Sequence, residues 1–116
     1  MCVKFFSFTH IFYGDSMENN IKYTMLYDIY GKLLTQKQQS IFEEYYIYNL
    51  SLREIADNKK ISYQAVRDSI KSSEKMLEEY ESKIGMYSLK NKLSKICSKD
   101  NFDKNDILKL LSEDDI

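Results

Sequence analysis

The chain has 116 residues, of which 43% are hydrophobic and 14% aromatic, which suits one domain with a hydrophobic core and excludes a disordered chain. Proline is absent and glycine occurs three times; so few helix breakers favour an all-α fold. The formal net charge of −1 gives no whole-protein electrostatic argument for nucleic acid, although residues 51–75 carry a net +2 and residues 101–116 a net −3.

The first sixteen residues, MCVKFFSFTHIFYGDS, differ from the rest of the chain. Their apolar run is interrupted by Ser, Thr and His and lacks a small-residue cleavage site, which argues against a signal peptide or a membrane span. Gly14-Asp15 can be encoded by codons that resemble a bacterial ribosome-binding site just before Met17. We therefore expect residues 1–16 to be a non-native or disordered leader, with Met17 as the native start.

The next segments read as helices that begin at well-defined caps. Apolar residues at three- and four-residue steps predict a first helix over 20–34, and we attribute Gly31 within it to the close crossing of another backbone. Thr35 and Gln38 form a T-x-x-Q capping box for a second helix. Ser51 and Glu54 form a similar box for a short third helix.

A long fourth helix is predicted over 63–84, with Ser62 as its N-cap and Gly85 as its C-cap. Two shorter helices follow, one around 89–96 and one over about 104–111. The expected domains are therefore a helix-turn-helix domain over 17–88 and a C-terminal helical extension with an acidic tail over 89–116.

The inner positions of the fourth helix form a heptad-like apolar seam with one polar residue: Val66, Ile70, Ser73, Leu77, Tyr80 and Ile84. The C-terminal helices can fold back over part of it, but their apolar residues span only about 10 Å against about 21 Å for the seam. We therefore expect a homodimer with Leu77, Tyr80 and Ile84 near the interface. The alternative is that the C-terminal helices cover the seam.

The third and fourth helices have the pattern of a helix-turn-helix. Ala56 is the small residue that lets the helices cross, Ile61 is the expected buried plug of the turn, and Val66 and Ile70 anchor the second helix. The alternative is two helices that merely meet in a small bundle. Lys60 lies where many such turns have glycine; a positive φ there would cost a lysine about 1 kcal/mol, so we expect a different turn geometry.

The candidate nucleic-acid-binding residues lie on the outer face of the fourth helix and in the turn: Gln64, Arg67, Lys71, Lys75, Lys59 and Lys60. Gln64 and Arg67 could pair with bases, while Lys71 and Lys75 contact phosphates. Asp68 and the acidic distal half of the helix oppose such binding, because phosphate neutralisation dominates affinity. A solvated face with intrahelical pairs is the alternative.

The sequence offers little for catalysis or metal binding. Cys2 and Cys97 are far apart, His10 is the single histidine, and neither a zinc site nor a Cys–His nucleophile pair can be assembled from them. No glycine-rich phosphate loop is present. We expect a cytoplasmic protein that is not an enzyme, uses no cofactor or metal and does not insert into a membrane.

Four motifs in order resemble the bacterial YlxM family: LLTQKQ at 33–38, SLREIA at 51–56, SYQAV at 62–66 and EKMLEEYE at 74–81. The resemblance covers about Tyr23 to Ser88. It implies a fold similar to region 4 of RNA polymerase sigma factors. It also implies a regulatory link to the signal recognition particle, with the particle's protein or RNA as partner. A DNA-binding transcription regulator is the alternative that the helix-turn-helix itself suggests.

Overall fold

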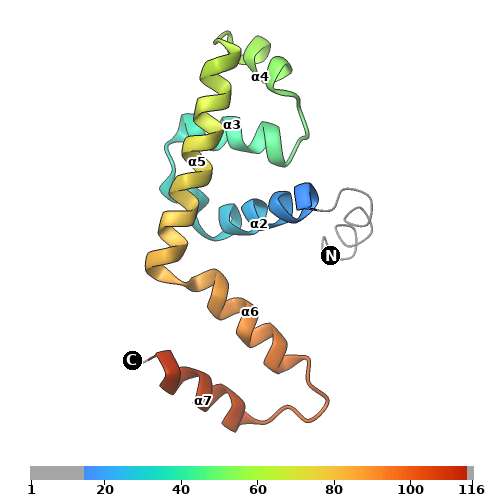
Figure 1. Ribbon diagram of the computed structural model, residues 1–116, viewed down its shortest axis with the longest axis vertical. Helices are drawn as coiled ribbons and strands as arrows, with labels where there is room; N and C mark the ends of the chain where they lie inside the picture. Colours follow the sequence, from blue (N-terminus) through green and yellow to red (C-terminus); the bar gives the residue numbers. More distant parts are fainter. Residues whose placement is uncertain (1–14, 115–116) are drawn as a thin grey trace.

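The computed structural model describes residues 15–114, and all their regular structure is helical. Figure 1 shows the helices in chain order: α2 (Asp15–Tyr30), the 3-10 turn η1 (Gly31–Leu33), α3 (Gln36–Tyr46), α4 (Leu52–Lys59), α5 (Tyr63–Ile84), α6 (Met86–Cys97) and α7 (Lys104–Asp114). The predicted all-α class is thereby confirmed. The predicted leader lies outside the described residues up to position 14, whereas Asp15 and Ser16 belong to α2.

The predicted caps are present in the structure. The Thr35 and Ser51 side chains each accept a hydrogen bond from the backbone of the third residue of the helix, and the Gln38 and Glu54 side chains each accept one from the backbone of the cap. The Ser62 side chain accepts from the backbone N–H of Ala65. Each cap satisfies backbone groups that would otherwise lack a partner, which explains why these helices start where they do.

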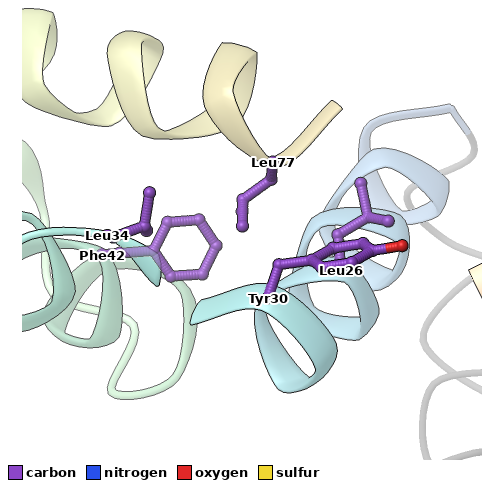
Figure 2. Close-up of a cluster of buried hydrophobic side chains, with 5 residues drawn as sticks. All are labelled: Leu26, Tyr30, Leu34, Phe42 and Leu77. Atoms are coloured by element: carbon purple, nitrogen blue, oxygen red, sulfur yellow. The ribbon is translucent and has the colours of Figure 1, made fainter. Parts of the chain in front are cut away.

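Long helix α5 is central to the molecule, because both hydrophobic clusters include its residues. The first cluster joins α5 to α2 and α3 (Figure 2) and contains Leu26, Tyr30, Leu34, Phe42 and Leu77. The second joins it to α3 and α4 and contains Ile41, Ile55, Ala56, Val66 and Ile70. Ser73 is fully buried, and its hydroxyl has no hydrogen-bond partner among the described residues.

The first helix ends earlier than predicted, at Tyr30, and the chain continues as the 3-10 turn. The explanation of Gly31 was also wrong. A Cβ atom at Gly31 would lie 2.7 Å from the ring of Tyr27, so a side chain of the preceding helix occupies the space rather than a crossing backbone. The glycine lets the Tyr27 ring lie against the main chain and stack on Phe42 at 4.5 Å between ring centroids.

The apolar seam of α5 is covered differently from the prediction. Leu77, expected near a dimer interface, is fully buried against α2 and α3 within the single chain. Tyr80 is partly buried and packs against the same cluster, and Ile84 remains 57% exposed. Helices α2, α3 and α4 supply this cover, whereas α6 contains no buried residue, and α6 and α7 extend away from the other helices (Figure 1).

Candidate nucleic-acid interface

Three of the four residues predicted for the core of the α4–turn–α5 unit are buried. Ala56, Val66 and Ile70 are all buried in one cluster with Ile55. Ile61 is only partly buried and packs against the edge of that cluster, so the prediction of a buried plug was wrong. The turn bends the chain at the surface, where it leaves part of this side chain accessible.

Lys60 adopts the left-handed conformation that was not expected of a lysine, with φ 58° and ψ 43°. The backbone N–H groups of Lys60 and Ile61 both donate to the carbonyl oxygen of Ala56, which closes α4. A left-handed residue after a helix is the usual way to satisfy its last carbonyls, and glycine is the residue best suited to it. The turn therefore has the common geometry, with a lysine in the strained position.

The six candidate nucleic-acid-binding residues differ in their contacts: some are bound to other side chains, and the others are exposed to solvent. Lys59 is engaged: its Nζ lies 3.0 Å from Oε2 of Glu44 on α3 and donates to the hydroxyl of Ser40. Gln64 is exposed, and its side-chain amide donates to Oδ1 of Asp68 at 2.8 Å. The remaining four side chains are exposed: Lys60, Arg67, Lys71 and Lys75.

Three of the five acidic residues of α5 contact other helices. Glu74 accepts from the hydroxyl of Tyr46 on α3, Glu78 pairs with Lys22 of α2 at 2.9 Å, and Glu81 accepts from Tyr30 of α2 at 2.7 Å. Burial, reinforced by the hydrogen bond to Glu74, raises the pKa of Tyr46. Like any tyrosine hydroxyl at neutral pH, this group is protonated and donates to Glu74.

The basic residues of α5 have no such partners. Among the side chains that the structure describes, no carboxylate forms an ion pair with Arg67, Lys71 or Lys75. These three residues, spaced four apart, form a row that we call the basic row. The objection that the distal acids would repel phosphates is met only in part: Glu78 is paired with Lys22, and hydrogen bonds hold Glu74 and Glu81 toward α3 and α2, but Glu79 is exposed.

One feature of this surface was missed from the sequence. The guanidinium of Arg53 on α4 lies 5.9 Å from the ring centroid of Tyr63, the first residue of α5, and Tyr63 is 47% exposed. Tyr63 directly follows the cap Ser62. Its position could have indicated an exposed aromatic side chain, because a residue in the first turn of a helix need not face the core. The contact joins the two helices of the motif across the turn.

Comparison with known proteins identifies the family. A family model described as “Putative helix-turn-helix protein, YlxM / p13 like” (UPF0122) matches residues 17–113. The chain belongs to this family. The resemblance drawn from its four sequence motifs is thereby confirmed.

Individual YlxM-like relatives agree with this assignment. The UPF0122 protein of Thermoanaerobacter sp. strain X514 is 48% identical over 77 residues, which cover 63% of this chain and 66% of the relative. The protein of Caldanaerobacter subterraneus is 46% identical over 76 residues, 66% and 65% of the two chains. That of Bacillus thuringiensis is 50% identical over 68 residues, 59% and 62%. The matches thus span just under two thirds of these relatives.

Membrane-spanning helices and metal clusters are both absent from the described part of the chain. No helix between residues 15 and 114 is both long and apolar enough to cross a lipid bilayer. Within the same residues, no three His, Cys, Asp or Glu side chains are grouped so that they could hold a metal ion.

Proposed function

We propose that this protein is a cytoplasmic regulator of the signal recognition particle pathway and that it acts by binding nucleic acid through the basic row. The observation that carries the proposal is the separation of charge on α5. Three basic side chains face solvent without a described acidic partner, while the acids at 74, 78 and 81 contact α2 and α3. The chain belongs to the YlxM-like family. Because the resemblance to this family implies a link to the signal recognition particle, it supports the RNA of the particle as the target.

A DNA-binding transcription regulator is the second candidate. It is favoured by the position of Gln64 and Arg67 in the first two turns of α5, where a recognition helix contacts base edges. Gln64 would have to exchange its hydrogen bond to Asp68 for one to a base. Asp68 itself is exposed on the same face, where it would approach duplex phosphates, and this lowers our preference for duplex DNA.

A titration of the full chain against three labelled ligands tests the proposal. The ligands are the RNA of the signal recognition particle, a promoter duplex from the same bacterium and a duplex of random sequence, each at two salt concentrations. We expect the particle RNA to bind most tightly, with affinity that falls as salt rises because counterions are released from phosphates. Tightest binding to the promoter duplex would favour the second candidate. Binding to none of the three would contradict both.

A further inference from the structure

The pair formed by Arg53 and Tyr63 offers a chemistry that the basic row lacks. Arg53 is on α4 and Tyr63 begins α5, and the guanidinium carbon lies 5.9 Å from the ring centroid. A guanidinium at this distance is attracted to the ring, which steadies the aromatic side chain. Tyr63 nevertheless remains 47% exposed to solvent, so part of its surface stays available to a ligand.

Tyr63 is also in line with the basic row. Residues four apart on a helix are neighbours, so Tyr63, Arg67, Lys71 and Lys75 follow one another at steps of about 6 Å, along a line that turns by about 40° around the helix at each step. Lys60 lies in the turn just before Tyr63 and is exposed. The surface therefore consists of one aromatic ring at the N-terminal end of the basic row, with Lys60 three residues earlier in the turn.

An aromatic ring followed by a row of cations favours nucleic acid with unpaired bases over a duplex. In a duplex, both faces of each base are covered by the neighbouring bases, so a tyrosine ring at a helix surface gains nothing from them. An unpaired base offers a free face, and proteins that bind loops or single strands combine aromatic stacking with cations along the backbone. The basic row follows the ring along α5 and can hold the phosphates of nucleotides next to such a base.

We infer that Tyr63 is a stacking platform for one unpaired base of a loop or single strand, and that the basic row binds the phosphates of the adjoining nucleotides. The inference rests on the proposed function and narrows its ligand from nucleic acid in general to an unpaired segment. RNA loops and single-stranded DNA share this chemistry, so both are used as probes below. Arg53 acts as a positioning residue for the ring.

The test compares binding of an RNA hairpin with an all-adenosine loop, the same stem as a blunt duplex, and an adenosine DNA strand. The full chain is titrated as the wild type and as Tyr63→Ala, Tyr63→Phe and Arg67→Ala/Lys71→Ala. We expect Tyr63→Ala to bind the hairpin about tenfold more weakly, since base–aromatic stacking contributes about 1–3 kcal/mol. Tyr63→Phe keeps the ring and should bind like the wild type.

A fluorescent adenine analogue in the loop supplies a readout that a purely structural role would not change. Its emission should be quenched on binding the wild type and Tyr63→Phe, and much less on binding Tyr63→Ala, while circular dichroism verifies that each variant is folded. A similar pattern with the DNA strand also supports the inference and shows that the ring accepts either sugar. For the blunt duplex, we expect the same affinity with and without the Tyr63 ring.

The outcomes separate this inference from the proposed function. Hairpin binding that Arg67→Ala/Lys71→Ala weakens and Tyr63→Ala leaves unchanged would overturn the stacking platform alone. An equal loss of duplex and hairpin binding in Tyr63→Ala would overturn it too, because the ring would then support the helix rather than a base. A wild type that binds none of the probes would overturn both proposals.

Discussion

Lys60 has a backbone conformation that is unfavourable for a residue with a side chain. A left-handed conformation costs a residue with a Cβ atom about 1–2 kcal/mol relative to glycine, and Lys60 adopts it at φ 58°. We expect Lys60→Gly to raise the free energy of unfolding by about 1 kcal/mol in urea titrations. Lys60→Ala is the control, since it keeps the Cβ atom and should not stabilise. An equal increase in the free energy of unfolding of both variants would show that loss of the lysine charge, and not relief of the backbone conformation, causes the effect.

Val66 is the residue on which the alignment of the motif depends most directly, because it is fully buried between α4 and α5. Val66→Asp should abolish cooperative thermal unfolding, since an unpaired buried carboxylate costs several kcal/mol and a small domain has little more in total. The neighbouring Arg67→Asp introduces the same carboxylate at an exposed position. It should remain folded, and near-native melting of Val66→Asp would refute the placement of the helix.

At the scale of elements, Glu81 stabilises the junction between α5 and α6. Its carboxylate accepts from the hydroxyl of Tyr30 at 2.7 Å and from the backbone N–H groups of Tyr87 and Ser88 at 3.0 Å. Burial alone would raise the pKa of Glu81, but the hydrogen bonds from Tyr30, Tyr87 and Ser88 outweigh it and hold the pKa below the usual 4.5. The two N–H groups lie in the first turn of α6, which has no side-chain cap of its own.

A lowered pKa makes the junction sensitive to acid. The stabilisation from Glu81 is fully present above its unfolded-state pKa of about 4.5 and is lost as the pH falls through the lower folded-state pKa. Glu81→Gln should therefore unfold more easily at neutral pH and lose less stability on acidification than the wild type. Glu79→Gln changes an exposed residue and serves as the control. Identical pH dependence of Glu81→Gln and wild type, in urea unfolding, would contradict this role.

The helix caps were predictable from the sequence, whereas the contacts between helices were not. Thr35, Ser51 and Ser62 cap helices through hydrogen bonds within three residues, so short patterns suffice to find them. The cover of Leu77 depends on how α2 packs across α5, which the periodicity of one helix does not contain. The same holds for the acids of α5, because a helical wheel cannot show that Glu78 meets Lys22 of another helix.

At the scale of the whole molecule, much of the exposed apolar surface lies at the C-terminal end. The molecule measures 54 × 32 × 20 Å, and α6 and α7 extend from its lower end in Figure 1. Several large side chains there are at least 40% exposed: Ile84, Met86, Phe102, Leu108 and Leu111. Because Leu77 is buried within the chain, a homodimer is expected to form through this C-terminal end instead.

A second copy of the chain would cover the apolar side chains that are exposed at this end. We expect a dimer in sedimentation equilibrium at micromolar concentration, and dissociation in Leu108→Glu/Leu111→Glu. A wild-type mass of 13.8 kDa that does not change with loading would contradict association.

The central claim is that the basic row binds nucleic acid, and the most direct measurement is the salt dependence of affinity in two charge-matched variants. Arg67→Ala/Lys71→Ala removes two charges from the row, and Lys90→Ala/Lys92→Ala removes two exposed charges from α6. With the particle RNA as ligand, we expect the first variant to bind more weakly and to lower the slope of log affinity against log salt by about 0.7–0.9 for each phosphate that it no longer neutralises. The α6 variant should keep the wild-type slope, and equal slopes in all three proteins would contradict the claim.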